Sequence, residues 1–72
     1  MTIREIADRM VRICVENKID VRAAFDAQAA HLERQGANHG EIEYFLFMVK
    51  FACDDAGIDS KWTGIPPEKI RK

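Results

Sequence analysis

Few side chains in this sequence could perform chemistry, and they are widely spaced. The two histidines, His31 and His39, are eight residues apart, and neither has a cysteine or carboxylate at a recognised metal-ligand spacing. Asp54 and Asp55 are adjacent, and adjacent residues of a helix point about 100° apart, so these two carboxylates do not form a pair that shares a proton. The sequence therefore predicts no metal site, no cofactor and no acid–base pair.

The two cysteines, Cys14 and Cys53, are the other candidates for chemistry. Two cysteines without a CxxC pair are too few for a zinc site, and each falls on an apolar stripe of its expected helix. Because no signal peptide precedes them, we expect two reduced thiols in the core of a cytoplasmic protein, with a disulfide between them as the alternative. Core thiols are poor nucleophiles, and no nucleotide-binding or hydrolase motif occurs, so we expect no enzyme activity.

Length and charge narrow the remaining classes of function. The chain has 72 residues, which is enough for one domain with a small core, and its 11 basic and 12 acidic residues give a formal net charge of -1. That balance provides no general attraction to nucleic acid or to an anionic membrane. Lys50 interrupts the longest apolar run, which is far shorter than the roughly 20 residues of a membrane span.

The first expected helix covers about residues 3–17. Thr2 and Glu5 have the spacing of a capping box, in which each side chain accepts a hydrogen bond from a backbone amide at the helix start. The apolar positions then repeat with helical periodicity. They are Ile3, Ile6, Ala7, Met10, Ile13 and Cys14, with Val11 and Val15 widening one flank.

Two further helices are expected at about residues 20–35 and 40–56. Asp20 is the expected N-cap of the second helix, whose five alanines between positions 23 and 30 make it slim and poor in apolar area. The glycines at 36 and 40 mark a turn, and Asn38 or His39, which lie between them, caps the third helix. The third helix is expected to end at Gly57.

These elements predict an all-α protein, a small three-helix bundle without strands. Residues 1–57 form the expected domain, and residues 58–72 form a C-terminal tail that contains Trp62 and the Pro66–Pro67 pair. We expect this tail to pack back on the domain or on a partner.

The third helix has more apolar surface than one side of a helix can hold. Helical spacing divides it into two stripes on nearly opposite sides, separated by a polar seam of Glu43, Lys50 and Asp54. The inner stripe comprises Ile42, Phe45, Leu46, Val49, Ala52, Cys53 and Ala56. The outer stripe comprises Tyr44, Phe47, Met48 and Phe51. One stripe can build the core, so the other needs a second cover.

The sequence leaves two alternatives for what covers the outer stripe. The tail could fold back, with Trp62 and Ile65 over the stripe, or another chain could bind there. Aromatic rings and a methionine at helical spacing are typical of helix recognition. We therefore predict a non-catalytic protein-binding module, an adaptor, regulator or inhibitor, which forms a homodimer. The predicted binding residues are Tyr44, Phe47, Met48, Phe51 and Trp62.

A small DNA-binding regulator is the alternative. The segment Thr-Ile-Arg-Glu-Ile-Ala at the N-terminus resembles the first helix of many helix-turn-helix repressors, which implies that Arg4, Arg9 and Arg12 could meet phosphates. The basic tail could assist through Lys69, Arg71 and Lys72. However, the apolar pattern continues past the point where a helix-turn-helix would turn, and the arginines alternate with acids. The sequence therefore argues against nucleic acid as the partner.

Overall fold

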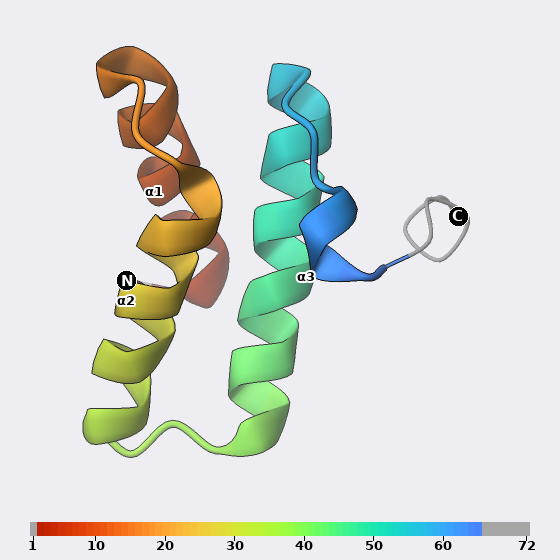
Figure 1. Ribbon diagram of the computed structural model, residues 1–72. Coiled ribbons are helices and arrows are strands. Elements are labelled where there is room, and N and C mark those ends of the chain that lie inside the picture. Colours follow the sequence, from red (N-terminus) through yellow and green to blue (C-terminus); the bar gives the residue numbers. More distant parts are fainter. Residues whose placement is uncertain (1, 66–72) are drawn as a thin grey trace.

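The computed structural model describes residues 2–65, which form a small all-α three-helix bundle, as the sequence predicts (Figure 1). Helix α1 covers Ile3–Asn17, α2 covers Val21–Arg34 and α3 covers His39–Ala56. A single 3-10 turn, η1, follows at Lys61–Thr63. Within residues 2–65 there is no strand, and no helix is both long enough and apolar enough to span a membrane.

Capping boxes begin α1 and α3. The amide of Glu5 donates to Thr2 Oγ1 at 3.2 Å, and the amide of Thr2 donates to Glu5 Oε1 at 2.9 Å. Asn38 and Glu41 exchange the same pair of bonds at 2.8 and 3.0 Å, so Asn38 is the cap. Asp20 is also the N-cap of α2, but its side chain makes no capping bond with any described residue, so its predicted role is only partly fulfilled.

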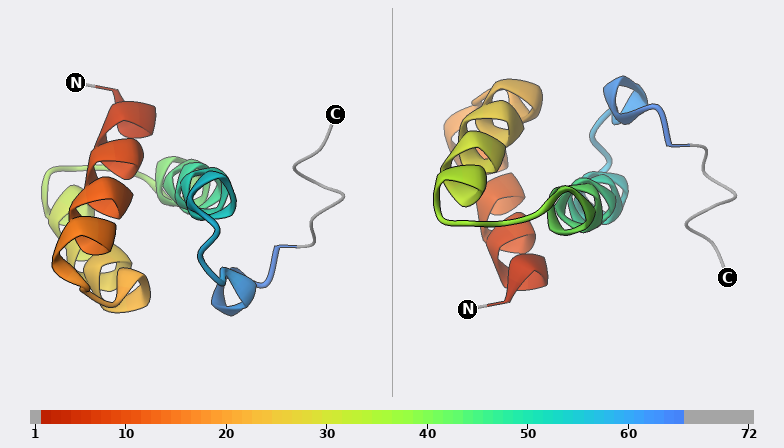
Figure 2. Two further views of the ribbon diagram at one scale, coloured as in Figure 1. Left: turned by 90° about the horizontal axis from the view of Figure 1, so that it is seen from above. Right: turned by 90° about the horizontal axis from the view of Figure 1, so that it is seen from below.

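The core lies mainly between α1 and α3, which pack together more extensively than either packs with α2. Phe45, Val49 and Cys53 of α3 are completely buried. They meet smaller buried side chains from the other helices, which are Ala7, Val11, Cys14 and Val21. Figure 2 shows α3 lying to one side of the pair formed by α1 and α2.

Three members of the expected apolar stripes are exposed. The side chains of Ile13 and Val15 are 44% and 50% exposed, and Ala56 is also exposed. On α1, the line through Ala7, Val11 and Cys14 faces α3, so Ile13 and Val15 fall on opposite edges of that line. Helical spacing had identified α1 as amphipathic, but it did not fix which part of the wide apolar stripe faces α3.

The first part of the C-terminal tail packs on the bundle. Ile58 and Trp62 lie against the core, and the rings of Trp62 and Phe25 are 5.6 Å apart. Phe25 in turn stacks on Phe45 at 5.2 Å, which links α2, α3 and the tail through three aromatic rings.

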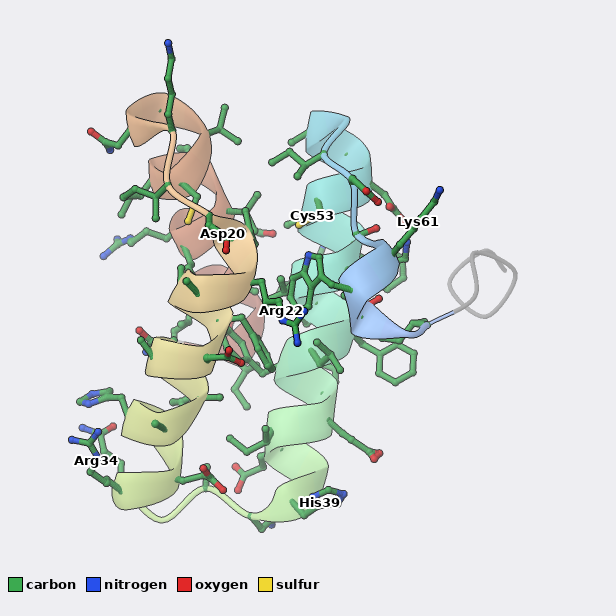
Figure 3. All side chains as sticks on the ribbon, in the orientation of Figure 1. Asp20, Arg22, Arg34, His39, Cys53 and Lys61 are labelled. Carbon is green, nitrogen blue, oxygen red and sulfur yellow. The ribbon has the colours of Figure 1, made fainter. Side chains whose placement is uncertain are left out.

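Figure 3 shows Arg34, His39 and Lys61 at the periphery, whereas Cys53 points between the helices.

Candidate functional site

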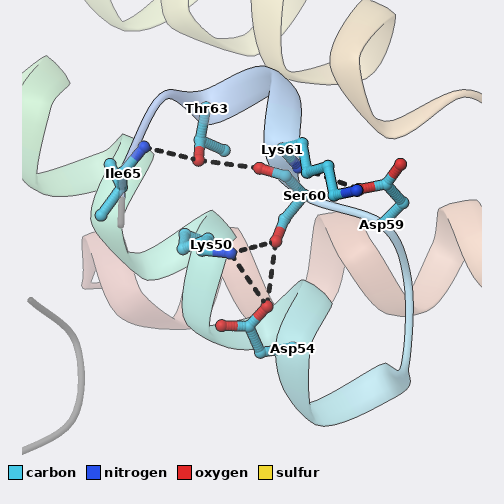
Figure 4. A network of polar contacts seen from close by, with 7 residues as sticks. All are labelled: Lys50, Asp54, Asp59, Ser60, Lys61, Thr63 and Ile65. Atoms are coloured by element: carbon cyan, nitrogen blue, oxygen red, sulfur yellow. Dashed lines mark hydrogen bonds and ion pairs between the residues drawn. The ribbon is translucent and has the colours of Figure 1, made fainter. Parts of the chain in front are cut away.

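Lys50 is the one buried member of the polar seam of α3, since it is only 6% exposed, whereas Glu43 and Asp54 are exposed. Lys50 Nζ donates to Asp54 Oδ1 at 3.2 Å and to Ser60 Oγ, and Ser60 Oγ donates to Asp54 Oδ1 at 2.9 Å (Figure 4). Ser60 is itself 4% exposed. Both the positive charge and the hydroxyl are therefore buried with partners, as buried polar groups require.

This triad of Lys50, Asp54 and Ser60 fixes the path of the tail. It holds the tail against one flank of α3, and η1 follows directly. Thr63 Oγ1 donates to the carbonyl of Ser60 at 2.8 Å and accepts from the amide of Ile65 at 3.2 Å, which keeps the turn closed. The triad was not among the features predicted from the sequence. A lysine within an apolar run, four residues before an aspartate, was the available signal.

The structure separates the four residues of the outer stripe. Met48 packs against the core, whereas Tyr44 and Phe51 are 48% and 37% exposed. Phe47 is half-buried and does not belong to the core cluster of the described residues. We call Tyr44, Phe47 and Phe51 the aromatic face of α3. They are three and four residues apart, so they form one continuous surface along the helix.

Trp62 does not join the aromatic face. It contacts Phe25 and lines a hollow with residues of α1 and α2, among them Val15 and Val21. The tail up to Ile65 thus covers the Lys50 flank of α3 and leaves Tyr44 and Phe51 exposed. Residues 66–72, which include Pro66–Pro67, lie outside the described part of the chain.

Acidic side chains border the aromatic face. Glu41 and Glu43 precede Tyr44 and Phe47 by three and four residues, and Asp55 follows Phe51 by four, so each lies beside a ring. All three are exposed. Among the described residues, Lys50 of α3 is buried in the triad, the imidazole of His39 is 3.8 Å from Glu43, and Asp55 lines a hollow together with Arg12 of α1. The exposed charged side chains of α3 next to the rings are therefore acidic.

The arginines that the DNA-binding alternative would use do not form a uniformly positive surface. Arg4, Arg9 and Arg12 are all exposed on α1. Arg9 and Arg12 line one hollow together with Glu5 and Asp8, so opposite charges alternate there. The basic residues Lys69, Arg71 and Lys72 lie outside the described residues.

Neither cysteine has the environment of a reactive thiol. Both are free and buried. Burial, with a smaller contribution from the charge of Asp54, raises the pKa of the Cys53 thiol to about 11. Burial also raises the pKa of Cys14. Both thiols are therefore protonated and unreactive near neutral pH. Within residues 2–65, no three histidine, cysteine or acidic side chains converge as metal ligands would.

A second apolar surface, which the sequence did not reveal, lies between α1 and α2. It is an open groove with a volume of about 390 Å³. We call it the α1–α2 groove. Its apolar lining comes from both helices and from the link between them, and comprises Ile6, Met10, Ile13, Ile19, Ala24 and Leu32. Ile13 and Ile19 are 44% and 47% exposed. Arg9, His31, Gln28 and Gln35 supply its polar lining.

The geometry thus provides two exposed apolar surfaces and no assembled set of reactive groups among the described residues. Comparisons of the chain with protein-family models, with curated proteins and with solved structures found no match.

Proposed function

We propose that this chain is a non-catalytic protein-binding module, of the adaptor, regulator or inhibitor class, which binds through the aromatic face of α3. Its first partner is a second copy of the chain, so that the basic unit is a homodimer. One observation carries the proposal: Tyr44 and Phe51 remain 48% and 37% exposed on a helix whose opposite side buries Phe45, Val49 and Cys53 completely.

The physical chemistry of these rings supports a contact surface. Phenylalanine and tyrosine offer large apolar area with few rotatable bonds, and the tyrosine hydroxyl can stay at a wet rim. A chain of this length also buries only roughly 60% of its unfolded surface, so a second copy adds apolar burial that the monomer cannot reach alone. Symmetric self-association is the commonest route to such an interface.

Light scattering of the purified protein over a range of concentrations tests the proposal. We expect a dimer at tens of micromolar, and we expect Phe47→Glu and Phe51→Glu to yield folded monomers, because a charge on the face costs more in a dry interface than in water. Circular dichroism checks that each variant keeps its helices.

Ala27→Glu is the control, because Ala27 is exposed on α2 and lies outside both the aromatic face and the α1–α2 groove. This variant should associate like the wild type. A wild-type protein that stays monomeric throughout, or a face variant that associates unchanged, would contradict self-association through α3.

A further inference from the structure

The charged side chains at the rims of the α1–α2 groove and of the aromatic face differ in sign. Arg9 is the one charged side chain that lines the groove within residues 2–65, and Glu5 and Asp8 lie with it in a neighbouring hollow. The aromatic face is bordered by Glu41, Glu43 and Asp55. Both surfaces therefore have an apolar centre, and the charged side chains at their rims are of opposite sign.

The aromatic face is also shorter than the groove. From Tyr44 to Phe51 the rings extend over about 10 Å of α3, at 1.5 Å per residue. On α2 the groove lining runs from Ala24 to Gln35, which is about 16 Å. An exposed helix face of that length fits within the groove, in the manner of helix-in-groove recognition.

Pairing of two aromatic faces brings like charges together instead. In an antiparallel contact centred on Phe47 and Met48, Glu41 of one copy lies near Asp55 of the other. In a parallel contact, each acid lies near its own counterpart. Like charges placed opposite one another are destabilising, and Lys50 cannot offset them because the triad buries it.

We propose that the aromatic face of one copy docks in the α1–α2 groove of the next copy. This inference rests on the proposed self-association and specifies the surface that receives α3. The face lies on α3 and the groove lies between α1 and α2, so the contact joins two unlike surfaces. A dimer joined by one such contact keeps one free face and one free groove, so further copies add only at concentrations above those that form the dimer.

Complementation between two blocked variants tests this arrangement. Phe51→Glu blocks the face, and Ile13→Glu blocks the groove at a side chain that is 44% exposed and so tolerates the change in the monomer. We expect each variant alone to self-associate at least about thirtyfold more weakly than the wild type, the loss typical of a central contact residue. Mixed in equal amounts, they should form a heterodimer that does not grow further, because one intact face meets one intact groove.

The outcomes separate this inference from the proposed function. If the wild type and Ile13→Glu associate equally while Phe51→Glu does not, face-to-face pairing is correct and the groove assignment is overturned. If the wild type associates but the mixture stays monomeric, the groove assignment is also overturned. A wild type that never associates overturns both. Ile19→Glu, at a second exposed groove position, should reproduce Ile13→Glu, and Ala27→Glu should behave as the wild type.

Discussion

Lys50 shows that a charged residue of a helix can belong to the interior of the protein. Its ammonium group is buried with Asp54 and Ser60, so it belongs to the interior and not to a solvated seam. A buried charge is tolerated only while its partners remain, because removal of one partner leaves the charge without compensation. Asp54 is therefore a structural residue, although it is exposed and adjacent to Asp55.

Asp54→Ala should lower the free energy of unfolding by about 1 to 2 kcal/mol, since it removes the acceptor of two hydrogen bonds, one of them from a buried ammonium group. Asp55→Ala is the matched control, because Asp55 is exposed and its loss should cost less than about 0.5 kcal/mol. Urea denaturation of both variants measures the difference. Equal stability of the two would show that the triad does not stabilise the tail.

At the scale of elements, the ends of α1 and α3 are set by residues in the left-handed conformation. Gly57 at the end of α3 has a φ of 73°, which suits glycine. Lys18 at the end of α1 has a φ of 56°, and its Cβ makes that conformation unfavourable. The amide of Ile19 donates to the carbonyl of Cys14 at 2.9 Å, which fixes the turn despite the strain.

Lys18→Gly should therefore raise the free energy of unfolding by about 1 kcal/mol, because glycine adopts the left-handed region without a steric penalty. Asn17→Gly provides the opposite case. Asn17 is the last residue of α1, and its side-chain amide donates to the carbonyl of Ile13 at 2.9 Å, so this change should lower stability by about 1 kcal/mol. Thermal and urea denaturation should place the two variants on opposite sides of the wild type. The same sign for both would contradict the assignment of strain to Lys18.

At the scale of the whole molecule, the tail completes a small core. The three aromatic rings of Phe25, Phe45 and Trp62 connect α2, α3 and η1 across distant parts of the sequence. Helix α2 is rich in alanine and adds little apolar area of its own, so Trp62 supplies part of the cover that α2 lacks. The bundle and the beginning of the tail therefore stabilise each other.

Trp62→Ala should lower the free energy of unfolding by about 2 kcal/mol, somewhat less than truncation of a fully buried ring, because Trp62 is half-buried. Lys61→Ala, an exposed neighbour in the same turn, should change it by less than about 0.5 kcal/mol. Chemical denaturation followed by circular dichroism compares them. If Trp62→Ala were neutral, the tail would be an appendage and not part of the core.

Much of the fold could be predicted from the sequence because local signals define it. The capping box at Thr2 marks one helix start, Asn38 or His39 was the expected cap of another, Gly57 marks an end, and helical spacing identifies the buried side of α3. The candidate surfaces were harder to predict, because they depend on how helices are rotated against one another. Exposure of Ile13 and burial of Lys50 both arise from tertiary contacts, which periodicity within one helix does not contain.

The placement of Trp62 and Tyr44 gives the chain two separate optical probes. It contains one tryptophan and one tyrosine, the first against Phe25 on the core side and the second on the aromatic face. The emission spectrum of the tryptophan therefore reports release of the tail, whereas the tyrosine signal responds to whatever covers α3. Unlabelled protein can thus distinguish loosening of its structure from assembly in a single spectroscopic titration.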